Sequence, residues 1–400
     1  MKKSLWIGGR QKTQSLKNLH ILVTIPSFHE HRDPCCRGRD VKARILIDPW
    51  QLRHSLGATF SRFRSLFTMT KSSFLILLAV FAFPAAAQEN QPKRNGSGNL
   101  AKSKAEFQAA VEIRSDIDYV GNDNPRQKLD LFLPKGRAAD AEPLPLVVFI
   151  HGGGWAKGDK RSGLFRLREF LLTKKYAAAS IGYRLSDEAQ WPSQIHDCKA
   201  AIRWLRANAG DLGIDPDRMA AWGTSAGGHL VAMLGVSHGV EVLEGDLGPH
   251  PNVSSEVACV VNFFGPSELL TMNDHPSIMD HMAPDSPESK LVGGPILENP
   301  NKAKNASPVT WVSSDDEPSL IVHGTDDKLV PYPQSVVLEK ALEKAGVPTV
   351  LLTVKGGGHG QGFGPAVNEA VTTFLNHQLL GEEKKISDGE VDAAPFTPRR

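Results

Sequence analysis

The sequence predicts an α/β fold in which a mostly parallel central sheet is flanked by helices on both faces. Apolar runs of strand length alternate with segments of helical periodicity from residue 111 to residue 380. Such alternation is typical of parallel strands joined by helical crossovers. Uninterrupted apolar runs, such as 146–150, indicate strands buried on both faces. A hydrophobic content of 40% is enough for one sizeable core, so we expect a single domain over residues 105–380.

Each element follows from this pattern in chain order. The first two strands, 111–120 and 127–133, are expected to form a hairpin through residues 121–125. Further strands are predicted at 146–150, 177–183, 218–222, 257–264, 319–323 and 349–354. Helices are predicted at 162–174, 193–209, 228–236, 333–345 and 366–380.

A serine is expected at the apex of a sharp turn between the strand 218–222 and the helix 228–236. The turn has the sequence GTSAG, with Gly223 two residues before Ser225 and Gly227 two residues after it. A strained turn that exposes the serine oxygen leaves no room for a Cβ at either glycine position. Ser225 is therefore the candidate nucleophile.

A run of glycines follows the apolar strand 146–150 and can bring bare backbone N–H groups to a reacting carbonyl. We expect Gly153 and Gly154 to donate there, although the sequence does not separate them from Gly152. Together with the amide of Ala226, directly after the nucleophile, these donors would form an oxyanion hole. His151 is expected to be structural.

Two later segments supply an acid and a base. Asp327, with Asp326 as the alternate, follows the apolar strand 319–323, and His359 lies in a glycine-rich loop after the strand 349–354. An acid at a strand end is suitably placed to orient a histidine. The chain order of serine, acid and histidine is that of one class of serine hydrolases.

These motifs resemble the α/β-hydrolase esterase/lipase family, in the branch of acetyl esterases, hormone-sensitive-lipase-like enzymes and feruloyl or acetylxylan esterases. The resemblance covers residues 111–380 and rests on HGGGWAKGDK, the stretch 183–192, GTSAGGH, ASPVTWVS, HGTDDKLVP and GGGHG. It implies an α/β-hydrolase fold, hydrolysis of short-chain carboxylic esters, and catalysis by Ser225, Asp327 and His359. It also implies that no metal or cofactor is needed, and it leaves the substrate open.

Two alternatives remain. Similar proteins with an HGGGW loop cleave formyl amides with the same triad, so an arylformamidase-like amidase is a rival enzyme. A catalytically inactive hydrolase used as a binding module is a rival of another class, although no triad member is missing. A small-molecule or glycan ester is the expected partner, and the oligomeric state is left undetermined.

The N-terminal region predicts export. Residues 69–87 combine a charged start, the apolar stretch 74–83 and three alanines before Gln88, as in a cleaved signal peptide. The apolar stretch is too short for a stable membrane anchor. Residues 1–68 are either an extension upstream of the true start at Met69 or a disordered basic arm, and residues 88–104 are expected to be a linker.

Charge argues against a nucleic-acid partner. Residues 1–68 contain 13 Lys and Arg against 4 Asp and Glu, a net charge of +9, whereas residues 88–400 contain 32 against 40, a net charge of −8. An acidic body is a poor match for a phosphate backbone. No paired His or Cys spacing indicates a metal site.

Several segments fall outside the regular pattern. Residues 266–304 form an insertion that is a candidate lid or plain surface cover, and the charged tail 381–400 is expected to be disordered. Cys198 and Cys259 are interpreted as buried single residues rather than as a disulfide. The remaining polar residues are predicted to have structural or surface roles. These are packing for His229, loop ordering for Asp159 and Lys160, structural contacts for Arg184 and Asp197, and surface positions for His196 and His281.

Overall fold

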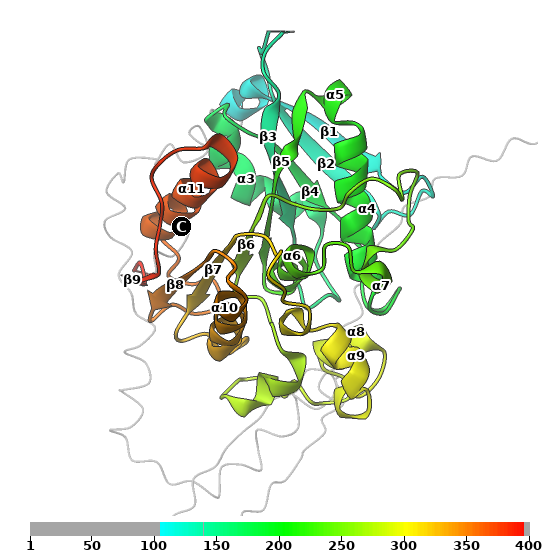
Figure 1. Ribbon diagram of the computed structural model, residues 1–400, viewed down its shortest axis with the longest axis vertical. Helices are drawn as coiled ribbons and strands as arrows, with labels where there is room; N and C mark the ends of the chain where they lie inside the picture. Colours follow the sequence, from blue (N-terminus) through cyan, green and yellow to red (C-terminus); the bar gives the residue numbers. More distant parts are fainter. Residues whose placement is uncertain (1–104, 139, 396–400) are drawn as a thin grey trace, which may run out of the picture. The chain divides into compact units, whose positions relative to one another are not determined.

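The computed structural model describes residues 105–138 and 140–395. In this part of the chain, nine strands form one sheet in the order β1-β2-β4-β3-β5-β6-β7-β8-β9 (Figure 1). The second strand pairs antiparallel with both of its neighbours, and all other neighbouring pairs are parallel. The predicted α/β class is confirmed. The strands are β1 (Val111–Asp118), β2 (Lys128–Pro134), β3 (Leu144–Ile150), β4 (Ala177–Ile181), β5 (Ile214–Thr224), β6 (Cys259–Phe263), β7 (Ser319–Gly324), β8 (Thr349–Lys355) and β9 (Gly389–Asp392).

Helices cover both faces of the sheet because the central strands are apolar on both sides. Phe149 and Trp222 project toward α3 (Gly163–Leu172) and α11 (Pro365–Leu380) and belong to one buried cluster with them. Val148 and Ala221 belong to a second cluster on the opposite face. This second face is covered by α4 (Ser193–Ala207), α6 (Ala226–Val236) and α10 (Pro333–Ala345), and shorter helices α5 (Ala209–Leu212) and α7 (Glu241–Glu244) follow α4 and α6.

The first strand ends two residues earlier than predicted, and its register with β2 shifts between Arg114 and Ile117. Asp116 adopts a φ of 58° at this bulge. The Nζ of Lys160 lies 2.7 Å from the Asp116 carboxylate and 2.8 Å from that of Asp130. The expected loop-ordering role of Lys160 is therefore confirmed, with acceptors on the sheet.

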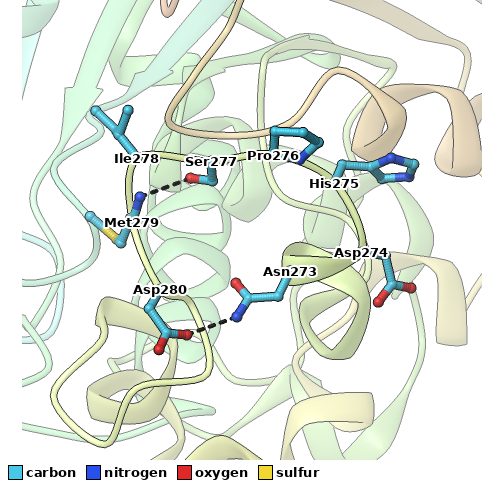
Figure 2. A pocket seen from close by; sticks show the side chains of 8 residues that line it. All are labelled: Asn273, Asp274, His275, Pro276, Ser277, Ile278, Met279 and Asp280. Atoms are coloured by element: carbon cyan, nitrogen blue, oxygen red, sulfur yellow. Dashed lines mark hydrogen bonds between the residues drawn. The ribbon is translucent and has the colours of Figure 1, made fainter. Parts of the chain in front are cut away.

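The insertion 266–304 consists of short helices separated by loops. They are η4 (Leu269–Asp274), α8 (Pro287–Val292), η5 (Ile296–Glu298) and α9 (Pro300–Asn305). Leu269, Leu291 and Ile296 are fully buried in the same cluster as α4 and α6. The end of η4 and the loop that follows it, residues 273–280, border a hollow of about 520 Å³ (Figure 2). The insertion is thus part of the packed domain.

The expectation of a wholly disordered tail is wrong for residues 389–392. They form β9, which pairs parallel with β8 from Leu352↔Gly389 to Lys355↔Asp392. The strand is mostly exposed, because edge pairing depends on backbone hydrogen bonds and does not require large apolar side chains. The Asp388 carboxylate also accepts from the Leu351 amide at 2.8 Å.

The two cysteines of the described chain are free and buried, as expected. Cys198 lies on α4 and packs in the cluster beneath α4 and α6, whereas Cys259 lies on β6 and packs beneath α3 and α11. Burial raises the pKa of both thiols. The central sheet separates them.

The expected extension, signal peptide and linker, residues 1–104, lie outside the described residues. Among the residues that are described, no helix is both long enough and apolar enough to cross a membrane.

Candidate active site

Ser225 occupies the sharp turn between β5 and α6. Its backbone is strained, with φ 56° and ψ −124°. Its amide donates to the Phe263 carbonyl at 2.9 Å, and its carbonyl accepts from the His229 amide at 2.9 Å. The turn requires its glycines, because a Cβ on Gly223 would lie 2.1 Å from the Gly227 carbonyl oxygen. A Cβ on Gly227 would lie 2.1 Å from the carbonyl oxygen that ends β3.

The glycine loop, residues 151–158, lies against the serine turn. A Cβ built on Gly152 would come within 3.2 Å of the Ser225 Cβ. Gly153 and Gly154 have φ values of +117° and +59°, a region that favours glycine. Among the described residues, the amides of Gly153, Gly154 and Ala226 donate to no protein acceptor. These three amides are therefore available to an acceptor outside the described chain, and the Ala226 amide lies at the positive end of α6.

Asp327 and His359 form the predicted acid–base contact. The Nδ1 of His359 lies 2.7 Å from Oδ2 of Asp327. The other carboxylate oxygen, Oδ1, accepts from the amides of Leu329 at 2.8 Å and Val330 at 3.0 Å. Asp327 is fixed by its own loop and directs one oxygen at the histidine.

Burial distinguishes Asp327 from the alternate Asp326. The Asp327 side chain is fully buried. Asp326 is exposed, and within the described part of the chain its side chain accepts only from the neighbouring Thr325. Burial alone would raise the pKa of the Asp327 carboxyl, but hydrogen bonds from His323 and His359 outweigh it and lower this pKa. The carboxylate therefore stays ionised beside the histidine.

The structure brings the serine close to the acid–base pair without closing a hydrogen bond between them. Within the described chain, the Ser225 hydroxyl and the Nε2 of His359 have no hydrogen-bond partner. Phe263 and Phe264 link the serine turn to the histidine. The Phe263 carbonyl accepts from the Ser225 amide, and the ring centroid of Phe264 lies 4.4 Å from that of His359. Catalytic hydrogen bonds are often open before substrate binds.

Phe264 and His323 support the site and were not predicted. Phe264 has a φ of 43°, which turns the chain directly after β6, and no pattern in the sequence indicates this strain. His323 is fully buried on β7, with Nε2 2.9 Å from the Val330 carbonyl and 3.3 Å from the Asp327 carboxylate. Its position four residues before Asp327 was the available signal. His323 and His359 thus contact the same carboxylate oxygen, Oδ2 of Asp327.

Two histidines outside the acid–base pair have the structural roles that the sequence predicted, whereas a third differs from its predicted position. His229 accepts from the indole N–H of Trp155 at 3.1 Å, and burial lowers its pKa to about 4. His151 stacks on Tyr183 at 4.3 Å and is also buried. The third is His281, which is predicted to lie at the surface but is only 1% exposed. It is buried because the insertion folds over it and supplies Glu288 as a partner.

Arg184 and Asp197 form the expected structural ion pair, at 2.7 Å. Asp159 binds Arg161 at 2.7 Å and caps the short turn that follows. Both pairs order chain segments that flank the glycine loop.

In the described chain, one group of acidic side chains is close enough to hold a cation. The carboxylate oxygens of Glu339, Glu343 and Asp388 lie within 4.8 Å of one another. They belong to α10 and the segment before β9, whereas the candidate nucleophile, acid and base lie on the turn and loops that follow β5, β7 and β8.

Comparison with known proteins identifies the family of this chain. The BD-FAE family model matches residues 129–342. Esterase LipQ of Mycobacterium tuberculosis is 30% identical over 272 residues, which cover 67% of this chain and 61% of LipQ. The chain thus spans about three fifths of that relative, and 63% of the related esterase LipC.

Solved structures that are similar to this chain also include esterases. A truncated carbohydrate esterase from gut microbiota is 34% identical with a TM-score of 0.63, covering 68% of this chain and 97% of that one. A bifunctional GH43-CE protein of Bacteroides eggerthii is 32% identical with a TM-score of 0.62, covering 66% of this chain and 38% of that one.

Proposed function

The chain belongs to the BD-FAE family of α/β-hydrolase esterases, and on this basis we propose that it is a serine carboxylesterase that hydrolyses short-chain acyl esters. The observation that carries the proposal is the contact between buried Asp327 and half-buried His359, together with a strained serine turn and three amides that have no acceptor among the described residues. Each part corresponds to one requirement of acyl transfer: a nucleophile, a base with its orienting acid, and donors for an oxyanion.

The proposed reaction proceeds through an acyl-enzyme. The Ser225 hydroxyl attacks the ester carbonyl while Nε2 of His359 takes its proton, because serine is a weak nucleophile at its ordinary pKa. The Asp327 carboxylate accepts from Nδ1 and stabilises the imidazolium. The amides of Gly153, Gly154 and Ala226 stabilise the oxyanion. His359 then protonates the leaving alcohol and activates the water that releases the acid.

The proposed substrate is an acylated carbohydrate, such as an acetyl or feruloyl ester of a polysaccharide. Two of the structural relatives carry carbohydrate-esterase descriptions in their names. The signal-peptide pattern at residues 69–87 supports export to the compartment where such polymers occur. N-terminal sequencing of the native protein, with Gln88 expected as the first residue, tests the export proposal.

The activity is tested by initial rates on p-nitrophenyl esters from acetyl to dodecanoyl, with Ser225→Ala as the control. We expect a rate that is highest for acetyl or butyryl esters and is lost in the control. Retention of ester hydrolysis by Ser225→Ala would refute the assignment. Inactivity on every ester, with turnover of N-formylkynurenine, would favour the amidase alternative.

A further inference from the structure

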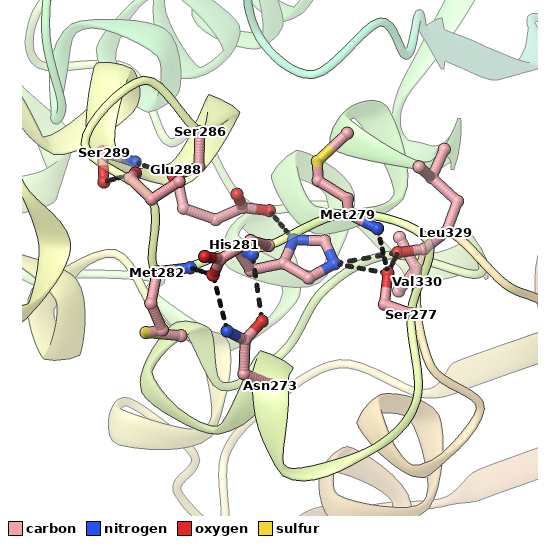
Figure 3. Close-up of polar contacts among 12 residues, drawn as sticks. Asn273, Ser277, Met279, His281, Met282, Ser286, Glu288, Ser289, Leu329 and Val330 are labelled. Atoms are coloured by element: carbon pink, nitrogen blue, oxygen red, sulfur yellow. Dashed lines mark hydrogen bonds and ion pairs between the residues drawn. The ribbon is translucent and has the colours of Figure 1, made fainter. Parts of the chain in front are cut away.

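His281 lies at the centre of a buried network within the insertion, and both of its ring nitrogens face acceptors (Figure 3). Its Nε2 lies 3.0 Å from the Leu329 carbonyl oxygen, and its Nδ1 lies 2.9 Å from Oε1 of Glu288. The Asn273 side chain accepts from the His281 backbone amide at 2.9 Å. The Ser277 Oγ lies 3.1 Å from the same Nε2 and accepts from it when its own hydrogen is donated to the Lys328 carbonyl. The ring is thus held at both nitrogens, and the backbone of His281 is held at its amide.

The contacts determine the protonation of this pair. A carbonyl oxygen is only an acceptor, so Nε2 must carry a hydrogen. A second proton is then needed between Nδ1 and the Glu288 carboxylate. Burial lowers the pKa of His281, but hydrogen bonding to Glu288 and the charge of Glu288 outweigh it and raise this pKa. The contacts and the raised pKa both favour a proton on Nδ1 of His281, facing the Glu288 carboxylate. A buried charged pair costs free energy unless its geometry and hydrogen bonds compensate for the lost water.

Its Nε2 contact leads directly to the proposed catalytic acid. Leu329 accepts from His281 through its carbonyl and donates through its amide to Oδ1 of Asp327, at 2.8 Å. Two further donors of the same insertion loop bind the adjacent carbonyl: the Ile278 amide at 2.8 Å and the Ser277 hydroxyl at 3.1 Å, both to Lys328. The acid loop, residues 325–330, is thus held in place by the insertion.

The Glu288 side of the pair leads to the glycine loop. Glu288 follows Pro287 at the start of α8, and a Cβ built on Gly154 would lie 3.3 Å from the Pro287 Cβ. Glu288 is 3% exposed, and its Oε2 has no partner among the described residues. Among the described residues, the one hydrogen bond of the Glu288 side chain is the contact with His281, so the position of this side chain, next to Pro287, depends on the pair.

We propose that His281 is a positioning residue for catalysis, which acts through Leu329 on Asp327 and, together with Glu288, holds the acid loop and the glycine loop in register. The inference rests on the proposed function, since it assigns a role relative to Asp327. The insertion is then a built-in support of the site as well as a cover.

Two amide substitutions separate this role from general packing. In His281→Gln, the side chain is long enough to place an N–H where Nε2 stands, facing Leu329. In His281→Asn, the amide reaches only the Nδ1 position, facing Glu288. Both variants lose the positive charge and the ring, so their stabilities should be similar. Replacement of His275, exposed in the same loop, by Gln and by Asn gives the matched controls.

We expect His281→Asn to lower kcat on p-nitrophenyl acetate by about 10- to 100-fold, because a displacement near 1 Å in catalytic groups has this effect. KM should change less than about twofold, and His281→Gln should recover most of the lost kcat. Thermal melting of the full chain identifies any variant that does not fold. Equal kcat values for the Asn and Gln variants would overturn the inference.

If both variants fail to fold, Glu288→Gln provides the test. It keeps the His281 ring and an acceptor for Nδ1 but removes the ion pair, so kcat should fall while KM is retained. An unchanged kcat in Glu288→Gln would contradict the inference. If Ser225→Ala is inactive and the two His281 variants have equal kcat values, only this inference is rejected. If Ser225→Ala is active, the proposed function itself is rejected.

Discussion

Replacement of Asp327 by asparagine is a sharp test of the site because the structure dictates how the new amide must lie. Oδ1 of Asp327 accepts from the amides of Leu329 and Val330. An asparagine must keep its oxygen there, since its NH₂ group would repel two donors. The NH₂ group then takes the place of Oδ2, which contacts Nδ1 of His359 at 2.7 Å and, less closely, Nε2 of His323 at 3.3 Å. It forces Nδ1 of His359 to become an acceptor. The histidine proton moves to Nε2, which can no longer accept the serine proton.

The expected loss follows from this tautomer change. An asparagine in place of the triad aspartate lowers kcat by about 10⁴-fold in another serine hydrolase, which corresponds to about 5.5 kcal/mol of transition-state stabilisation. We expect a decrease of about 10³- to 10⁴-fold in kcat on p-nitrophenyl acetate, with little change in KM. The control is Asp326→Asn, which alters an exposed carboxylate on the same loop and should stay within about twofold of wild type.

Stability gives an independent readout. The pKa of Asp327 is lowered in the folded protein, so its carboxylate stabilises the fold above the unfolded pKa of about 3.9. This contribution is lost as pH falls through the folded pKa. The stability difference between wild type and Asp327→Asn should therefore be present at pH 7 and shrink in acid. Asp327→Asn with more than a tenth of wild-type kcat, or a larger loss in Asp326→Asn, would refute the reasoning.

Three further substitutions test other parts of the structure. Gly227→Ala should prevent folding or destabilise by more than about 3 kcal/mol, because its Cβ would overlap a backbone oxygen, whereas Gly210→Ala, with nothing within 4 Å, should be neutral or stabilising; urea unfolding compares them. Trp155→Phe leaves the Nδ1 of His229 without its donor and should cost about 1–3 kcal/mol in thermal unfolding. Because Trp155 belongs to the glycine loop, kcat should also fall, and unchanged values of both quantities would show that this hydrogen bond does not hold the loop. Burial raises the pKa of Glu317 from 4.5 to about 8, so the free energy of unfolding should fall by up to about 1.4 kcal/mol per pH unit between these values, and Glu317→Gln should remove this slope in pH-dependent melting.

The site could be predicted where a local steric rule determined the residue. The roles of Gly223 and Gly227 could be predicted because the turn leaves no space for a side chain at either position. In the structure, a Cβ at either glycine would overlap a backbone oxygen. The choice of Asp327 over Asp326 was less secure, since both follow the same strand. Burial separates them, and burial depends on how α10 and β8 pack around the loop.

Features that depend on distant partners could not be predicted. His281 stood alone in the sequence, and its partner Leu329 lies 48 residues away. A buried histidine and an exposed one look alike until the insertion is folded. β9 was missed for a different reason: its pairing with β8 uses the backbone, so its polar side chains gave no strand pattern.

The sheet separates Cys198 from Cys259, and this separation determines how the folded domain responds to oxidising and reducing conditions. The two thiols lie in different buried clusters, and burial raises the pKa of each, so neither forms the reactive thiolate readily. Oxidants, glutathione and disulfide isomerases have no cross-link here to make or break. The folded state of the described residues thus contains no disulfide, so its stability does not rest on the oxidising conditions that a disulfide requires.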